Sequence, residues 1–329
     1  MAESFNEDTS VDHAVARVQP CEDPRIKQVL EALIRHSHAF VKEVEPTEGE
    51  WIEALNFLRR IGQKCEDRGN LSEFVLFSDV IGVSSLVENI AHRKPVEATT
   101  STVLGPFHVG GAPVLPNGTD IAHQKEKHPN AEAMYMAGRV LDRSGNPIEG
   151  AVLDVWHADE NGLYDVQQEG VNMDTGATIG GGLQNADVNY RGKFATAADG
   201  SFSFRSVRPK WYPIPHDGPV GELLTICKHH HFRPAHIHVI VTAKGCTPLI
   251  THIFPHDDPY VDKDVVFAVK SDLIKQFDKV EDPAELKAIG LEGIPFCWKV
   301  THDFVLAPGD DEGLAPGEFV PGGSISKKG

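Results

Sequence analysis

The chain has 329 residues, of which 40 % are hydrophobic and 24 % charged, and its formal net charge is −17. These values are typical of a soluble globular protein of about two domains, and such acidity argues against binding to nucleic-acid phosphates or anionic membrane surfaces. No apolar run is long enough to span a membrane and the N-terminus lacks a signal-peptide pattern, so we expect a cytoplasmic protein.

The N-terminal third is predicted to be helical after a loose, polar segment at residues 1–20. Pro24 suits the first turn of a helix, and apolar residues recur at helical spacing over residues 26–34. The helical pattern is expected to end near His92.

Two further helices are predicted from capping-box signatures, in which Glu follows the capping residue by three positions. Thr47 and Glu50 would open one helix. Asn70 and Glu73 have the same spacing and would open the next, which is expected to run through Ile81.

After residue 100 the composition shifts to short β-rich runs separated by turn signals, a pattern that predicts a β-sandwich or barrel. Residues 308–329, rich in Gly, Pro and Asp, predict a flexible tail. The expected strands are 135–141, 151–158, 201–207, 235–242, 249–254 and 296–305.

The cysteines are odd in number, scattered, and form no C-x-x-C pair, which predicts reduced intracellular thiols instead of disulfides or a zinc-thiolate site. Two of them, Cys227 and Cys246, are expected to be buried as small apolar residues. The five are Cys21, Cys65, Cys227, Cys246 and Cys297.

His236 and His238 lie two apart in an apolar, β-branched run, so on a strand both imidazoles face the same side. Such a pair is half of a metal site, and the pattern alone leaves the metal open. A cupin-type Fe(II) site would need a carboxylate a few residues later, but residues 239–242 offer none. Zinc would more often bring thiolates or a carboxylate.

Two tyrosines directly follow predicted strands: Tyr164 in a turn and Tyr212 in a proline-stiffened segment. With the two histidines they would form a Tyr2His2 site, and two hard, anionic phenolates favour Fe(III). The alternative is that both tyrosines simply pack in their turns.

Other histidines invite a simpler interpretation. His157 and His252 sit in predicted strands and are expected to be core residues or to support a ligand. The run at residues 229–231 is interpreted as a solvated turn before the next strand.

Together these motifs resemble the intradiol ring-cleaving dioxygenases, which carry non-haem Fe(III), from about Pro24 to Val305. The most specific blocks are R-P-A-H-I-H at 233–238, G-L-Y at 162–164 and Y-P-I-P-x-D-G-P-V-G at 212–221. Within the family the chain is most similar to the hydroxyquinol 1,2-dioxygenases, through residues 76–80, 101–108, 164–167, 212–215 and 258–267.

The resemblance implies a mainly β fold, with a β-sandwich Fe(III) catalytic domain (106–307) preceded by an all-helical dimerisation domain (21–105). A flexible N-terminus (1–20) and tail (308–329) complete the chain. It also implies a homodimer through the helical domain that can hold a lipid at its interface. The stretch 169–189 looks longer than the family's usual link and is interpreted as a surface-loop insertion.

For the site, the resemblance implies one Fe(III) per subunit on Tyr164, Tyr212, His236 and His238. Tyr212 would leave the metal and take a substrate proton, and Arg233 would balance negative charge developing on the ring. The implied substrate pocket comprises Leu76, Asp79, Val103, Leu104, Gly105, Pro106, Phe107, Ile214, Pro215 and Val266.

The implied activity is O2-dependent cleavage of hydroxyquinol (benzene-1,2,4-triol) to 3-hydroxy-cis,cis-muconate, the enol form of maleylacetate, in aromatic catabolism. Asp79 would accept a hydrogen bond from the third hydroxyl, which catechol lacks. The alternatives are a catechol or substituted-catechol 1,2-dioxygenase and, more remotely, a non-catalytic β-sandwich binding module.

Overall fold

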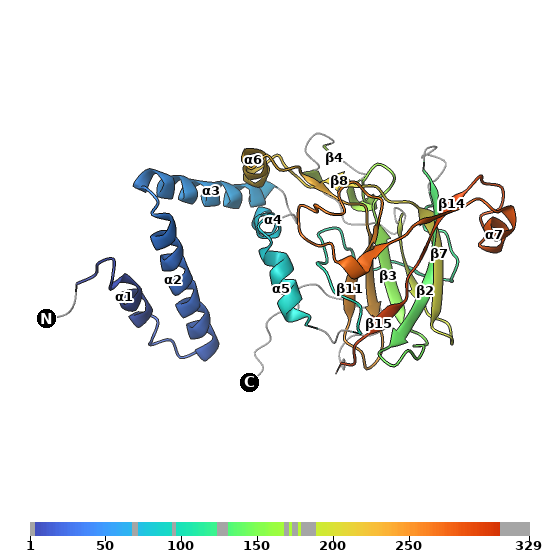
Figure 1. Ribbon diagram of the computed structural model, residues 1–329, viewed down its shortest axis with the longest axis horizontal. Helices are drawn as coiled ribbons and strands as arrows, with labels where there is room; N and C mark the ends of the chain where they lie inside the picture. Colours follow the sequence, from blue (N-terminus) through green and yellow to red (C-terminus); the bar gives the residue numbers. More distant parts are fainter. Residues whose placement is uncertain are drawn as a thin grey trace. The chain divides into compact units, whose positions relative to one another are not determined.

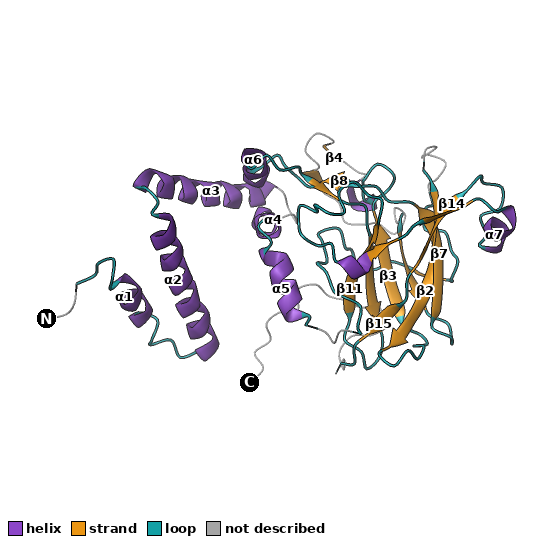
Figure 2. Cartoon of the chain, viewed as in Figure 1, coloured by secondary structure: helices purple, strands orange, loops and turns teal. Residues whose placement is uncertain are grey.

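The structure is a computed structural model that describes residues 4–67, 72–93, 97–123, 131–167, 171–172, 177–178 and 189–309. The chain divides into two compact units, residues 1–60 and residues 61–329. Helices dominate the chain up to residue 91 and strands dominate it from residue 114 onwards (Figures 1 and 2). The expected order of a helical segment followed by a β-rich segment is therefore confirmed.

The first unit contains α1 (Ser10–Ala16), α2 (Pro24–Val44) and most of α3 (Glu48–Asp67). Helix α1 lies where a loose segment was expected. Asp23 caps α2 by accepting hydrogen bonds from the amides of residues 25 and 26, which confirms the predicted start. The capping box at α3 is also confirmed, since Glu50 Oε2 accepts from the Thr47 amide at 2.8 Å and Thr47 Oγ1 accepts from the Glu50 amide at 3.3 Å.

The third predicted helix is wrong in its start, whereas its end near Ile81 is confirmed. Asn70 lies outside the described residues, and α4 (Glu73–Val80) is capped by Ser72, whose Oγ accepts from the Val75 amide at 3.4 Å. Glu73 is buried and accepts a hydrogen bond from the Val220 amide at 3.1 Å, so it does not complete a capping box. A second helix, α5 (Val83–Ala91), follows after a bend of 82° and ends where the helical pattern was expected to end.

The second unit contains two mixed sheets. One has the strand order β1-β6-β3-β10-β11-β12, and the other has the order β13-β14-β2-β15 with β7 paired to β2. Two small two-stranded pairs, β4 with β5 and β8 with β9, stand apart from these sheets. The bounds are β1 Val114–Leu115, β2 Ala133–Asp142, β3 Val152–His157, β4 Val171–Asn172, β5 Ala177–Thr178, β6 Arg191–Ala195, β7 Ser201–Val207, β8 Tyr212–Pro213, β9 Phe232–Arg233, β10 Ile237–Thr242, β11 Leu249–Pro255, β12 Ile274–Lys275, β13 Asp278–Val280, β14 Cys297–Thr301 and β15 Phe304–Leu306; the short helices are η2 Asp165–Gln167, α6 Pro219–Ile226, η3 Ser271–Leu273 and α7 Pro283–Ala288.

Side chains from both sheets fill one apolar core, as expected for a sandwich. Strand β10 lies between β3 and β11, all six of its residues are buried, and Val239 faces Val155 and Thr251 across the ladders. Burial on both faces explains why this run reads as apolar and β-branched without alternation. The site therefore rests on a central, rigid strand.

The predicted strand at 296–305 is two strands that keep one register against β2. The ladder is interrupted at residues 302–303, where the Arg139 amide donates to the Asp303 carboxylate at 2.8 Å instead of to a backbone carbonyl. The guanidinium of Arg139 meets the same carboxylate at 2.7 Å. The Asp303 side chain thus replaces one backbone hydrogen bond of the sheet.

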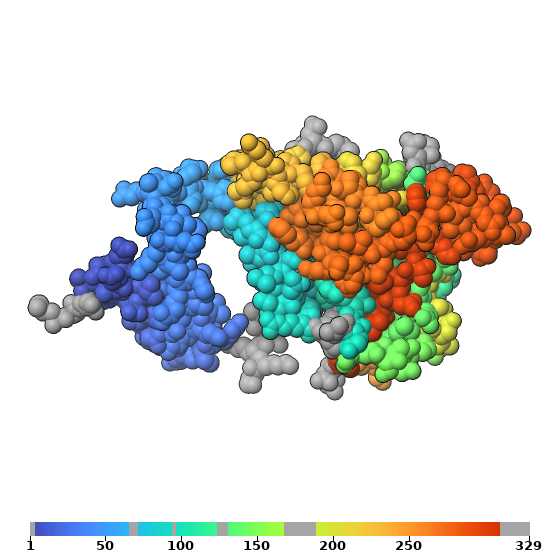
Figure 3. Space-filling view, viewed as in Figure 1, coloured from blue at the N-terminus to red at the C-terminus, as the bar shows by residue number. Residues whose placement is uncertain are grey.

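Helices α4, α5 and α6 and the segment after β11 pack together in the second unit, where the orange surface in Figure 3 meets the teal and yellow surfaces.

Of the helices that the structure describes, none alone is long and apolar enough to cross a membrane, and α4 with α5 pass that test only as a bent pair. All five cysteines are free thiols, but Cys227 is exposed and Cys246 only half-buried, so the predicted burial of these two was wrong. The expected tail from residue 310 onwards and most of 169–189 lie outside the described residues.

Candidate metal centre

Four buried side chains bring their donor atoms together at one point. Tyr164 follows β3, Tyr212 begins β8, His236 directly precedes β10 and His238 lies on it. Tyr164 Oη is 3.1 Å from His236 Nε2 and 2.9 Å from His238 Nε2, and those two nitrogens are 3.1 Å apart. Tyr212 Oη is 3.5 Å from Tyr164 Oη. The structure thus joins the four residues that the sequence predicted as ligands.

The hydrogen bond of His236 on its far side leaves a lone pair at this point. His236 Nδ1 lies 2.7 Å from the Pro234 carbonyl, which can only accept, so Nδ1 carries the proton and Nε2 carries a lone pair. Burial lowers the pKa of His236 and of His238 well below the ordinary value, so both rings are neutral. The two phenol oxygens and the two imidazole nitrogens make four close contacts with one another, but the phenols carry only two hydrogens to bridge them. A metal ion that binds all four atoms suits this arrangement better.

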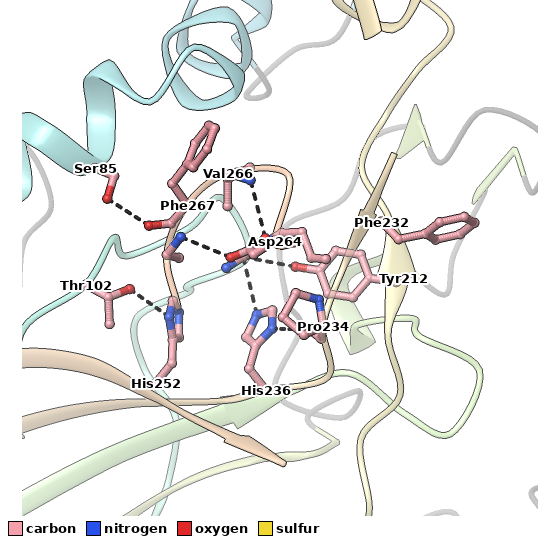
Figure 4. A network of polar contacts seen from close by, with 12 residues as sticks. Ser85, Thr102, Tyr212, Phe232, Pro234, His236, His252, Asp264, Val266 and Phe267 are labelled. Atoms are coloured by element: carbon pink, nitrogen blue, oxygen red, sulfur yellow. Dashed lines mark hydrogen bonds and ion pairs between the residues drawn. The ribbon is translucent and has the colours of Figure 1, made fainter. Parts of the chain in front are cut away.

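A third histidine supports His238 from behind. Nitrogen atoms of His236, His238 and His252 lie within 4.8 Å of one another. However, His252 Nε2 is 2.7 Å from His238 Nδ1. His252 Nδ1 is 2.8 Å from Thr102 Oγ1, as Figure 4 shows. Both nitrogens of His252 are therefore engaged, and it orients His238 as carboxylates or carbonyls do in other metal sites. This confirms the supporting role expected for His252, while His157 uses both nitrogens for hydrogen bonds within the core.

Aromatic rings and one close backbone approach hold the donors in place. Phe107 stacks on Tyr164 with ring centroids 4.5 Å apart, and Trp156 stacks on His238 at 4.5 Å and 11°. Gly105 adopts φ +78°, and a Cβ built there would lie 3.1 Å from His238 Cε1. His238 is thus confined by the indole ring on one side and by backbone on another.

The turn that carries Tyr164 is fixed by a buried ion pair. The Asp165 carboxylate accepts from Arg191 Nε at 2.6 Å and also from Arg191 Nη2, and both side chains are 2 % exposed. Gly162, at φ +85°, lets the same turn approach Tyr212, because a Cβ on Gly162 would lie 2.7 Å from Tyr212 Cβ. Sequence reasoning missed this pair, since its members are 26 residues apart and belong to no local motif.

Arg233 joins the donor cluster to an acidic partner. Its Nε lies 3.3 Å from Asp264 Oδ1, and its Nη1 lies 3.4 Å from Tyr212 Oη and 3.3 Å from His236 Nε2 (Figure 4). Burial lowers the pKa of Arg233, but the charges of Asp264, Tyr212 and Tyr164 outweigh this effect and raise the pKa above its ordinary value. Arg233 Nη2 is buried and has no hydrogen-bond partner among the described residues.

Beside these donors lies a cavity of about 560 Å³. Tyr212 and Arg233 line it, whereas Tyr164 and the two histidines lie behind its wall. Every residue predicted for the substrate pocket lines this cavity: Leu76, Asp79, Val103, Leu104, Gly105, Pro106, Phe107, Ile214, Pro215 and Val266. The cavity also reaches residues that were not predicted for the substrate pocket, namely Ser72, Glu73, Val75, Ser78, Ser84, Val87 and Glu88.

Two phenol oxygens and two neutral imidazole nitrogens, buried beside a cavity of this size, are typical of a metalloenzyme site. The family comparisons agree with this class. A model described as "Dioxygenase" matches residues 103–308, and one described as "Catechol dioxygenase N terminus" matches residues 23–99. The chain belongs to the intradiol ring-cleavage dioxygenases, a metal-dependent family of enzymes.

Individual relatives extend over nearly the whole chain. A hydroxyquinol 1,2-dioxygenase of Rhizobium sp. (strain MTP-10005) is 46 % identical over 92 % of this chain and 96 % of the relative. The structure of hydroxyquinol 1,2-dioxygenase from Pseudomonas putida DLL-E4 matches with TM-score 0.82 and 38 % identity, covering 92 % of this chain and 99 % of that one. Catechol 1,2-dioxygenase from Acinetobacter sp. ADP1 matches with TM-score 0.72 and 25 % identity, covering 93 % and 94 %.

Proposed function

We propose that this chain opens the ring of benzene-1,2,4-triol (hydroxyquinol) between its two adjacent hydroxyl-bearing carbons. Both atoms of O2 enter the product, 3-hydroxy-cis,cis-muconate, which is the enol of maleylacetate. Relatives named hydroxyquinol 1,2-dioxygenase support this substrate. The single observation that carries it is a half-buried carboxylate, Asp79, in the wall of the cavity.

We propose Fe(III), one per subunit, as the metal held by Tyr164, Tyr212, His236 and His238, because two phenolates prefer a trivalent ion. When bound, it supplies Lewis-acid activation of the diol toward O2. Iron content and a red-brown tyrosinate-to-iron absorption of the purified protein test this. A colourless, folded protein that binds no iron would contradict it.

The chain's own residues divide the remaining tasks. A 1,2-diol must lose two protons as it binds, and Tyr212 is the better acceptor of the two tyrosines because it lines the cavity while Tyr164 is fully buried. Arg233 lines the same cavity, and its Nη2, which has no partner among the described residues, is available to donate to an oxygen that gains negative charge.

Asp79 distinguishes a triol from a diol. It lies on α4, and burial raises the pKa of its carboxyl group, opposed by a hydrogen bond from Ser84 and by the charge of Arg233. A carboxylate has room for more than one hydrogen bond, so Asp79 can accept a further one besides that from Ser84. The third hydroxyl of hydroxyquinol can provide one, whereas catechol leaves the carboxyl group without it.

The test is the ratio of kcat/KM for hydroxyquinol to that for catechol, with identification of the products. A hydrogen bond to a charged group contributes about 1.5–3 kcal/mol, so Asp79→Ala should lower this ratio by about tenfold or more. Asp79→Asn, which keeps an acceptor oxygen, is the matched control and should lose less. An unchanged ratio in Asp79→Ala would contradict this role of Asp79. A preference of the unaltered protein for catechol would favour the second candidate, a catechol 1,2-dioxygenase, which the structural match to that enzyme supports.

We also propose a homodimer through the helical segment. Helix α2 buries none of its residues, and an apolar stripe along α2 and the first part of α3 stays exposed. Its members are Ile26, Val29, Leu33, Trp51, Leu55 and Leu58. Sedimentation would test the dimer, and extraction of the purified protein would test for the predicted lipid. The cytoplasmic location stays a prediction, supported by five free thiols.

A further inference from the structure

The loop of residues 264–268 is folded around a single buried carboxylate. Asp264 Oδ1 accepts from the Val266 amide at 3.3 Å, and Oδ2 accepts from the Ala268 amide at 3.0 Å. The carbonyl of Asp264 accepts from the Phe267 amide at 3.1 Å. Figure 4 shows the bond from Val266 that ends on the carboxylate. Because Val266 lines the cavity, Asp264 sets the position of one wall.

The loop has a second, independent anchor on its outer side. Phe267 adopts φ +58°, a conformation that a bulky residue rarely takes unless its surroundings enforce it. Its carbonyl accepts from Ser85 Oγ on α5 at 2.9 Å (Figure 4). Ser85 therefore restrains the loop without touching the donor cluster.

The same carboxylate also holds the guanidinium of Arg233. Asp264 Oδ1 is 3.3 Å from Arg233 Nε, and both residues are buried. A guanidinium is planar, so a fixed Nε fixes the directions of both terminal nitrogens. One of these, Nη1, lies 3.4 Å from Tyr212 Oη, and the other, Nη2, is buried and has no hydrogen-bond partner among the described residues.

We propose that Asp264 is a positioning residue, which directs Arg233 toward Tyr212 and at the same time places Val266 in the cavity wall. The Asp264 carboxylate then determines both the position of the positive charge beside Tyr212 and the position of the wall against which the substrate ring packs. The proposal rests on the proposed function, since it assigns Arg233 and Tyr212 their tasks in that reaction.

Two variants separate this role from loop folding alone. Asp264→Asn keeps the size of the side chain but removes the charge that holds Arg233. Ser85→Ala loosens the same loop from its other side and leaves Arg233 paired. Asp262→Asn, two residues away on the exposed side of the chain, is the matched control for loss of one carboxylate.

In the iron-loaded protein without substrate, Asp264→Asn should shift the tyrosinate-to-iron absorption to longer wavelength, because Tyr212 loses a hydrogen-bond donor and its phenolate becomes more electron-rich. With hydroxyquinol, kcat should fall by about tenfold or more, and KM should rise as well because Val266 loses part of the support that places it in the cavity wall. Ser85→Ala should change mainly KM and leave the absorption in place, and Asp262→Asn should match the unaltered protein.

The proposal is overturned if Asp264→Asn behaves like Ser85→Ala, with unaltered absorption and kcat. If Asp264→Asn does not fold, Arg233→Lys is measured instead: it keeps the charge opposite Asp264 and leaves the loop intact but lacks the planar fork. It should show the same absorption shift, and an unaltered spectrum would overturn the proposal. If the unaltered protein fails to cleave hydroxyquinol, the proposed function fails separately, because the absorption shift is read without substrate.

Discussion

Replacing Gly105 by Ala should damage the metal centre out of proportion to the size of one methyl group. Gly105 adopts φ +78°, and an added Cβ would lie 3.1 Å from His238 Cε1 and 3.8 Å from His238 Nε2. The substitution therefore combines backbone strain with a steric contact on a proposed ligand.

The two effects have different sizes and readouts. The left-handed conformation costs an alanine about 1–2 kcal/mol, which lowers the melting midpoint by several degrees. The contact requires His238 to shift by a few tenths of an ångström, but the 2.7 Å bond to His252 and the stacked Trp156 ring restrain it. Metal–ligand distances tolerate about 0.2 Å, so iron affinity should fall by about tenfold or more.

Gly111→Ala is the matched control. Gly111 has φ +88° and nothing within 4 Å of an added Cβ, so it reports the strain without the contact. Both variants should lose similar thermal stability in the iron-free form, measured by circular dichroism. Only Gly105→Ala should lose bound iron and visible absorption. If the two variants retain equal iron and equal absorption, the reasoning from the 3.1 Å contact is refuted.

Three further predictions concern residues around the site. His252→Leu removes the partner of His238 Nδ1 and should weaken iron binding by about 10–100-fold, measured by competition with a chelator. Arg191→Met leaves the buried Asp165 carboxylate without its partner and should lower the free energy of unfolding by about 3–5 kcal/mol in denaturant titrations. Burial lowers the pKa of His157 to about 4, from about 6.5 in the unfolded chain. Between about pH 6.5 and about pH 4 the unfolded chain therefore binds more protons than the folded protein, and the free energy of unfolding falls as the pH drops through this range. His157→Gln should remove up to about 3 kcal/mol of that pH dependence, measured as free energies of unfolding at pH 7 and pH 4.5.

Each of these has a result that would count against it. Thr102→Val, which removes only the hydroxyl behind His252, should weaken iron binding less than His252→Leu, and the reverse order would contradict the supporting role of His252. Equal stability of Arg191→Met and the unaltered chain would mean that the ion pair contributes nothing. His229→Gln alters an exposed histidine and should leave the pH dependence unchanged, so an equal effect of both histidine variants would contradict burial as the cause.

Several local features of this protein could be predicted from the sequence, because strands and helix caps depend on residues that are close together in the chain. The H-x-H spacing placed two imidazoles at one point, the Thr47 capping box began a helix, and strand 201–207 was predicted with its observed bounds. All ten predicted pocket residues line one cavity, but this success came from resemblance to a known family and not from periodicity.

What the sequence alone determined is the set of donor types and their place at strand ends, since side-chain period and ligand chemistry are local properties. Only the tertiary structure decided which polar groups hold those donors. His252 meets His238 through the pairing of β10 with β11, and Arg233 meets Asp264 from 31 residues away. Such partners are brought together by register and loop packing, which depend on the burial of the whole core and leave no pattern along the chain.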